Sequence, residues 1–164
     1  AFFFADTYVN QNPSADELVS ITLQACDHLK LFNIEPRTAL LSYSNLGSRD
    51  GDSAYKMRQV YAKLKKIAPD LIVEGEMQGD LALNQGLRER YIPDSILKGE
   101  ANLLVFPNLE SANLSMTLLK EMNNALPVGP ILMGTRAPAH ILAPSVTSRG
   151  MSRRSASASP SRPA

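Results

Sequence analysis

The stretch GEANLLVFPNLESAN, residues 99–113, decides the fold that the sequence predicts. Residues 101–106 form a short apolar run, which Pro107 and Asn108 end before a helical pattern begins at Leu109. An apolar run of strand length, bounded by Gly and Pro, is typical of a strand that is buried on both faces. Such strands belong to parallel sheets covered by helices, so this stretch predicts an α/β fold.

The same alternation of strand-like runs and helical patterns extends through most of the chain. We predict further strands at residues 2–4, 38–43, 71–73 and 129–134, and helices at residues 14–32, 57–67, 81–91 and 109–122. Ser14 and Glu17 have the spacing of a capping box at the start of the first helix. The last helix is expected to bury Leu114, Leu118, Leu119 and Met122. This order predicts a three-layer α/β/α domain with a mainly parallel sheet.

Polar residues follow the predicted strands, at the end of the sheet where α/β proteins bind ligands. Asp6 and Asn10 follow the first strand, the turn SNLGS (residues 44–48) follows the second, and Asn108 follows the stretch at 101–106. The turn is either an anion-binding turn or an ordinary connection, and the sequence favours the connection. Residues 74–80, EGEMQGD, are predicted to form a loop that either does acid–base work, orients a ligand or caps the next helix.

Composition narrows the function classes. The 164 residues suit one domain, and a formal net charge of +1 gives no sign of a nucleic-acid or membrane-surface partner. Cys26 is the single cysteine, which excludes an internal disulfide and a multi-cysteine metal site; no metal site is predicted. The start AFFFADT has no basic region typical of a targeting peptide, so we expect a cytoplasmic protein that is truncated at its N-terminus.

Several long segments carry a family resemblance. They are FADTYVNQNPSADEL, ALLSYSNLGS, APDLIVEGEMQGDLAL, PDSILKGEANLLVFPNLESAN and GPILMG. In this order they resemble the phosphate acetyl/butyryl transferase family, over roughly residues 2–150. HIL at residues 140–142 and PSVT at 144–147 are most similar to the version fused to the C-terminus of large bacterial NADP-dependent malic enzymes.

The resemblance implies a two-lobed fold like that of isocitrate and isopropylmalate dehydrogenases, with a ligand cleft between the lobes. Residues 1–150 would be the C-terminal lobe only. Residues 151–164, rich in Ser, Arg, Ala and Pro, are expected to be a disordered tail, either native or the product of a frameshift. The residues expected to line the cleft and bind ligand are Ser42, Ser44, Gly47, Ser48, Glu76, Gln78, Asp80, Asn108 and Asn113.

Catalytic residues of the family are missing from this sequence. By resemblance, a Ser and an Arg of the transferases fall on Ala143 and Pro144, and their catalytic Asp falls near Gly150. An alanine cannot hydrogen-bond a thiol, and a proline cannot clamp a phosphate. We therefore predict no catalytic residue in this chain, and the isolated fragment is expected to be inactive.

Three functions remain open from the sequence. The first is a fragment of an NADP-dependent malic enzyme, in which this domain binds acetyl-CoA or a related acyl-CoA as a regulator and supports self-association. NADP and a divalent metal would then belong only to an upstream domain. The second is a phosphate acetyltransferase that moves acetyl groups between CoA and phosphate. The third is a purely structural oligomerisation module.

Overall fold

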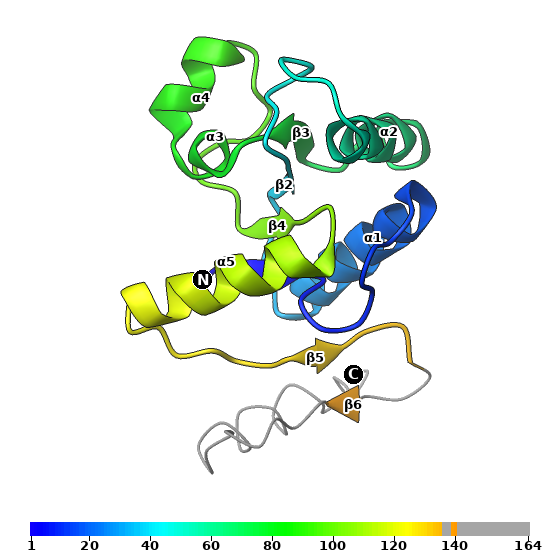
Figure 1. Ribbon diagram of the computed structural model, residues 1–164, viewed down its shortest axis with the longest axis vertical. Helices are drawn as coiled ribbons and strands as arrows, with labels where there is room; N and C mark the ends of the chain where they lie inside the picture. Colours follow the sequence, from blue (N-terminus) through cyan, green and yellow to red (C-terminus); the bar gives the residue numbers. More distant parts are fainter. Residues whose placement is uncertain (136–138, 141–164) are drawn as a thin grey trace. The chain divides into compact units, whose positions relative to one another are not determined.

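The computed structural model describes residues 1–135 and 139–140, and the chain divides into two compact units, Ala1–Ser115 and Met116–Ala164. Strands and helices alternate as the sequence predicts (Figure 1). The elements are β1 (Phe3–Ala5), α1 (Ala15–Leu31), β2 (Thr38–Leu41), α2 (Asp52–Ile67), β3 (Val73–Met77), α3 (Gly79–Leu83), α4 (Gln85–Tyr91), β4 (Leu103–Val105), α5 (Leu109–Met122), β5 (Ile131–Leu132) and β6 (Ala139–His140).

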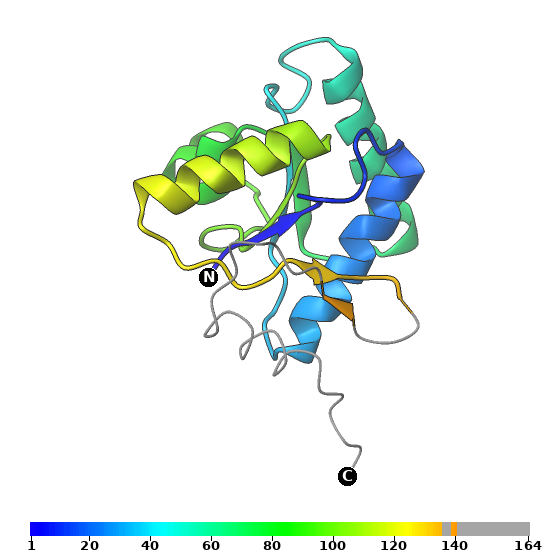
Figure 2. The ribbon, with the colours of Figure 1, turned by 60° about the horizontal axis from the view of Figure 1, so that its bottom comes forward.

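A four-stranded parallel sheet organises the first unit. Its strands lie in the order β1, β4, β2 and β3, and every neighbouring pair is parallel. In both ribbon views, α1 and α2 lie on one face of this sheet, and α3 and α4 lie on the other (Figure 1, Figure 2). The predicted α/β fold, with a parallel sheet between helical layers, is confirmed.

The stretch at residues 99–113 contains the buried strand that the sequence predicts, β4. Residues 101–106 are all buried, and β4 pairs with β1 on one side and with β2 on the other. The Asn102 side chain fixes the start of β2, because its Oδ1 accepts from the Arg37 amide at 2.7 Å and its Nδ2 donates to the Glu35 carbonyl at 2.8 Å. Pro107 and Asn108 end the strand before α5 begins.

The predicted capping box at the start of α1 is also confirmed. The Glu17 amide donates to Ser14 Oγ at 3.3 Å, and the Ser14 amide donates to the Glu17 carboxylate at 2.7 Å. Two of the orphan amides at the helix start are thus satisfied by local side chains. The helix then buries Leu18, Ala25 and Leu29.

The structure corrects the prediction for residues 74–80. The third strand begins at Val73 and runs to Met77, so residues 74–77 belong to a strand and not to a loop. Glu74 is 7% exposed and Glu76 is 1% exposed. Buried carboxylates are tolerated only where hydrogen bonds replace water, and the partners here come from distant segments. The Ser95 hydroxyl and the Ile96 amide donate to Glu74 at 2.7 and 2.6 Å.

The single helix predicted at residues 81–91 is two helices, α3 and α4. Asn84 ends the first and caps the second, because its Oδ1 accepts from the Leu87 amide at 2.9 Å. Arg88 of α4 is fully buried. Its guanidinium donates to the carbonyls of Leu81, Leu97 and Gly99 at 2.9, 2.8 and 2.6 Å and to Ser95 Oγ at 3.0 Å. Arg88 and Glu74 therefore meet at one buried hydroxyl.

The predicted apolar face of α5 is wrong. Its four members are exposed: Leu114, Leu118, Leu119 and Met122. The buried residue of this helix is Ala112, which belongs to the core cluster that contains Leu104. A turn of about 200° separates residues two apart in a helix, so packing through Ala112 points Leu114 away from that core.

The last two strands form a sheet of their own. The segment predicted as a strand at residues 129–134 contains β5, but β5 pairs antiparallel with β6 and does not extend the parallel sheet. The predicted tail at residues 151–164, and Ala143, Pro144 and Gly150, lie outside the described residues. Within residues 1–135 and 139–140, no helix has both the length and the apolar character needed to cross a membrane.

Candidate functional site

The carboxyl ends of the four parallel strands meet at one edge of the sheet. Residues 6–10 follow β1, residues 42–51 follow β2, Gln78 follows β3 and residues 106–108 follow β4. Because β2 and β3 are neighbours, the loop after β2 lies next to the end of β3. This edge is the position at which open α/β sheets bind ligands.

Two of the predicted residues, Ser44 and Gly47, donate hydrogen bonds to the buried carboxylate of a third, Glu76. Ser44 Oγ donates to Glu76 Oε1 at 2.9 Å, and the Gly47 amide donates to the same oxygen at 2.8 Å. Arg58, from α2, also donates to this oxygen at 3.1 Å. Arg58 was not among the predicted site residues. It belongs to a run of basic residues along α2, a pattern that is typical of a solvated face; they are Lys56, Arg58, Lys63, Lys65 and Lys66.

The remaining hydroxyls of the loop after β2 bind within the loop. Ser42 Oγ accepts from the Ser44 amide at 3.2 Å, and Ser48 Oγ accepts from the Asn45 amide at 2.9 Å. Gly47 and Ser48 are exposed, whereas Ser44 is fully buried. Gly47 has φ +83°, a conformation that glycine adopts without steric cost.

Gln78 forms two hydrogen bonds with Asn45, a residue that was not among the predicted site residues. The Gln78 amide donates to Asn45 Oδ1 at 2.7 Å, and Asn45 Nδ2 donates to Gln78 Oε1 at 2.9 Å. Asp80 does not join this group, because its Oδ1 accepts from the amide of Leu81, its own neighbour, at 2.8 Å. Asn45 is a polar residue of the turn SNLGS that the sequence singled out, but its pairing with Gln78 could not be predicted from the sequence.

Asn108 and Asn113 belong to a second group, at the ends of β4 and β1. Asn108 caps α5, since its Oδ1 accepts from the Ser111 amide at 2.9 Å. Asn113 Nδ2 donates to the Thr7 carbonyl at 3.3 Å. Asn113 thus links α5 to the turn that follows β1, whereas Asn108 stabilises the start of the helix.

The backbone amides of the turn at residues 44–48 are already occupied. Each amide from residue 44 to residue 49 donates a hydrogen bond inside the protein; the acceptors are Ser42 Oγ, Ser48 Oγ, the Glu76 carbonyl, Glu76 Oε1, the Asn45 carbonyl and Ser44 Oγ. Free amides are what an anion-binding turn offers. These amides are therefore not available to an anion, which leaves the exposed surface of Gly47 and Ser48 for any contact with a ligand.

Asp6 organises the turn after β1 and also lies outside the predicted set. Its carboxylate accepts from the amides of Tyr8, Val9 and Asn10 at 2.9, 3.1 and 2.8 Å, and from Asn10 Nδ2 at 2.7 Å. Burial raises the pKa of this carboxyl, but the hydrogen bonds from Tyr8, Asn10 and Val9 outweigh burial and leave the pKa below its ordinary value of 3.8. The hydrogen bonds around Asp6 therefore favour its ionised form.

Replacing Asp6 by Asn should remove a pH-dependent part of the stability. Because the pKa is lower in the folded state, the ionised carboxylate stabilises the protein above the unfolded-state pKa, and this stability is lost as the pH falls through the folded-state pKa. We expect Asp6→Asn to cost about 1 kcal/mol at pH 7, after allowance for solvent screening, and the difference from wild type to shrink as the pH falls below the ordinary carboxyl pKa of 3.8.

Equilibrium unfolding in urea between pH 2 and pH 7 checks this result. Asp94, an exposed carboxylate, supplies the control variant Asp94→Asn, which should track the wild type at every pH. If the free energies of unfolding of Asp6→Asn and wild type differ by the same amount at every pH, the charge of the Asp6 carboxylate does not contribute to stability.

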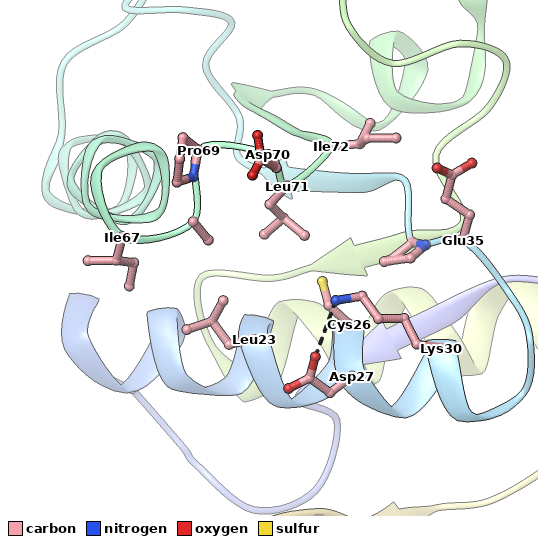
Figure 3. Close-up of a pocket in the computed structure, with 12 residues that line it drawn as sticks. Leu23, Cys26, Asp27, Lys30, Glu35, Ile67, Pro69, Asp70, Leu71 and Ile72 are labelled. Carbon is pink, nitrogen blue, oxygen red and sulfur yellow. Dashed lines mark hydrogen bonds and ion pairs between the residues drawn. The ribbon is translucent and has the colours of Figure 1, made fainter.

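A separate cavity of about 390 Å³ lies at the opposite edge of the sheet, beside the residues that precede β2 and β3 (Figure 3). Leu23, Cys26 and Lys30 of α1 line one side, and Pro69 and Leu71 line the other. Burial raises the pKa of the Cys26 thiol, which lies 3.5 Å from Thr38 Oγ1. In the part of the chain that the structure describes, no three His, Cys, Asp or Glu side chains are grouped to hold a metal ion.

Comparisons with known proteins agree with this geometry. The family model described as "Phosphate acetyl/butaryl transferase" matches residues 1–158. The chain is 55% identical, over 92% of its length, to an NAD-dependent malic enzyme of Rhizobium meliloti, and 51% identical, over 90% of its length, to an NADP-dependent malic enzyme of Haemophilus influenzae. A solved phosphotransacetylase from Streptococcus pyogenes superposes with a TM-score of 0.89 at 31% identity, over 94% of this chain.

The chain spans only part of each of these relatives. It covers 20% and 19% of the two malic enzymes and 47% of the phosphotransacetylase. The resemblance to malic enzymes that the sequence motifs indicated is confirmed, and the relatives include both NAD- and NADP-dependent enzymes. With the family model matching nearly the whole sequence, this chain belongs to the phosphate acetyl/butaryl transferase family.

Proposed function

We propose that this chain is the phosphotransacetylase-like regulatory part of a malic enzyme, and that it binds acetyl-CoA or a related acyl-CoA at the carboxyl edge of its parallel sheet. The observation that carries this proposal is the 55% identity to a malic enzyme over 92% of the chain. The polar loops that meet at that edge support it, because this is where α/β sheets bind ligands.

The proposed site lies in a cleft between this lobe and a second one, in the two-lobed arrangement of isocitrate and isopropylmalate dehydrogenases. The residues that line this lobe's side of the cleft are Ser42, Ser44, Gly47, Ser48, Glu76, Gln78, Asp80, Asn108 and Asn113. They bind the ligand or position the groups that bind it, and none of them reacts with it. Nicotinamide nucleotide and divalent metal bind elsewhere in the full-length protein, which we place in the cytoplasm.

Regulation in this proposal is a coupling free energy between two sites. Acetyl-CoA changes malate oxidation only if it binds more tightly to one arrangement of the protein than to another. Self-association of the family domain would spread that preference over several subunits. The proposed ligand therefore has to bind one arrangement of the protein more tightly than another, and the site needs no catalytic group.

Saturating acetyl-CoA should raise the melting temperature of the full-length protein and change its rate of malate oxidation. A ligand at about one hundred times its Kd stabilises the native state by about 2.7 kcal/mol. Differential scanning fluorimetry and titration calorimetry measure binding, and malate-dependent reduction of NAD and NADP measures the rate. A melting temperature that stays constant up to millimolar acetyl-CoA would leave only the structural oligomerisation module.

Phosphate acetyl transfer is the second candidate, because a solved phosphotransacetylase shares this fold at 31% identity. Ala143 and Pro144 stand against it, since they occupy the positions that resemble the catalytic Ser and Arg of the transferases. The full-length protein should therefore form no acetyl phosphate from acetyl-CoA and phosphate. Turnover above the rate without protein would favour the transferase over the regulator.

A further inference from the structure

A bulge in β3 singles out Glu76. Leu40 of β2 pairs with Gly75, but the next residue, Leu41, pairs with Met77, so Glu76 is the extra residue between them. Its carbonyl accepts from the Leu46 amide at 2.9 Å, in the loop after β2. Bulges re-aim side chains beside functional sites, and this one directs both the carbonyl and the carboxylate of Glu76 to that loop.

One oxygen of this carboxylate holds the loop at two points. Glu76 Oε1 accepts from Ser44 Oγ at the beginning of the loop and from the Gly47 amide at its tip. Glu76 is 1% exposed, so these contacts form where water does not compete. The Arg58 guanidinium supplies the opposite charge from 3.1 Å.

Arg58 extends the same hold to the end of the loop. Its Nη1 donates to the Arg49 carbonyl at 3.3 Å, and its Nη2 lies 3.7 Å from the Asp50 carboxylate. The Arg58 side chain is 30% exposed, so it bridges the buried carboxylate and the surface. The loop at residues 44–49 is thus fixed at its beginning, tip and end by one ion pair.

We propose that Glu76 is a positioning residue: paired with Arg58, it fixes the loop at residues 44–49 so that the exposed Gly47 and Ser48 meet the ligand, which Glu76 itself does not touch. The ligand part of this proposal rests on the proposed binding of acetyl-CoA. A loop that is already ordered loses less conformational freedom when a ligand binds, so the ion pair raises affinity through pre-organisation.

Glu76→Gln in the full-length protein tests this role. The amide keeps the size of the side chain but removes the charge that Arg58 pairs with. We expect hydrogen–deuterium exchange to speed up by about tenfold in residues 44–49, and the Kd for acetyl-CoA to rise by about tenfold. Arg58→Ala should reproduce both changes, and Arg58→Lys, which keeps the charge, should recover most of the wild-type values.

Glu74→Gln is the matched control. Glu74 is the other buried carboxylate of β3, and its contacts are to Ser95 and Ile96. This variant should leave exchange at residues 44–49 and the Kd at wild-type values. Equal effects of Glu74→Gln and Glu76→Gln on the loop would overturn the proposal, because a general loss of stability would then explain both.

The remaining outcomes separate the possibilities. Unchanged exchange in residues 44–49 of Glu76→Gln overturns positioning, and a raised Kd with unchanged exchange means that Glu76 contacts the ligand directly. Faster exchange with an unchanged Kd also overturns the proposed effect on binding. If the wild-type protein binds no acetyl-CoA, the proposed function fails, while the exchange data still decide whether Glu76 fixes the loop. Should Glu76→Gln not fold, the two Arg58 variants give the same decision.

Discussion

Arg88→Ala is expected to lower the free energy of unfolding by about 3–5 kcal/mol. Arg88 is fully buried, and its guanidinium satisfies the carbonyls of Leu81, Leu97 and Gly99. Without it the buried carbonyls of Leu81 and Leu97 and the partly buried carbonyl of Gly99 lose a donor. Each buried carbonyl left unpaired costs about 1–3 kcal/mol before relaxation. The same change removes the cation from the hydrogen-bond network that reaches Glu74 through Ser95.

Urea unfolding followed by circular dichroism measures this effect. Arg90→Ala is the matched control, since Arg90 is an exposed arginine two residues further along α4, and we expect it to cost less than about 0.5 kcal/mol. Arg88→Lys should fall between the two, because an ammonium has three donors and cannot span the same set of carbonyls. Equal stabilities of the two alanine variants would show that the buried network contributes nothing.

Gly75→Ala is expected to cost about 3 kcal/mol or more. Gly75 has φ +141°, and a Cβ at this position would lie 2.6 Å from the Leu40 carbonyl oxygen and 2.7 Å from Leu40 Cβ. The carbonyl belongs to the backbone of a central strand, so it cannot move aside without disturbing the pairing of β2 with β3. Only glycine fits this close approach of two strands.

The control for this variant is Gly86→Ala in α4. A Cβ on Gly86 would have its nearest contact at 3.7 Å, with Asn84 Oδ1, and alanine favours helix more than glycine does. We therefore expect Gly86→Ala to be neutral or to stabilise by up to about 1 kcal/mol. Urea unfolding measures both variants. If the unfolding midpoint of Gly75→Ala equals that of Gly86→Ala within error, the packing described for β2 and β3 is wrong.

The parts of the fold that the sequence predicted are those in which local signals agree. The run at residues 101–106 is apolar and bounded by Gly and Pro, and it is the buried β4. Ser14 and Glu17 form the capping box at the residues expected. In these places composition, spacing and burial point to the same structure, so one sequence was enough.

The extent of the third strand could not be predicted. The sequence indicated a strand at residues 71–73, whereas β3 runs from Val73 to Met77, and the burial of its carboxylates depends on partners far away in the chain. Glu74 and Glu76 carry charges that favour a loop, and only the contacts from Ser95 and Ile96, and from Ser44, Gly47 and Arg58, make their burial possible. The same limit applies to Arg88, whose partners are backbone carbonyls that no side-chain pattern reveals.

The candidate site was predictable in its place but not in its contacts. Parallel strands bring the polar residues that follow them to one edge, which the alternation of strands and helices already implied. The bulge at Glu76 and the two hydrogen bonds between Asn45 and Gln78 arise from the pairing register of the strands and from loop geometry. The sequence placed Asp6 after the first strand but could not give its contacts, since its partners are the amides of its own turn.

Hydrogen–deuterium exchange of the full-length protein, with and without saturating acetyl-CoA, tests the proposed site most directly. We expect exchange to slow by about tenfold or more in residues 42–48, 78–80 and 108–113, and to stay unchanged in residues 23–35 and 67–72, which flank the cavity at the opposite edge. Protection confined to that opposite edge, or none at the strand-end loops while calorimetry shows binding, would contradict the account.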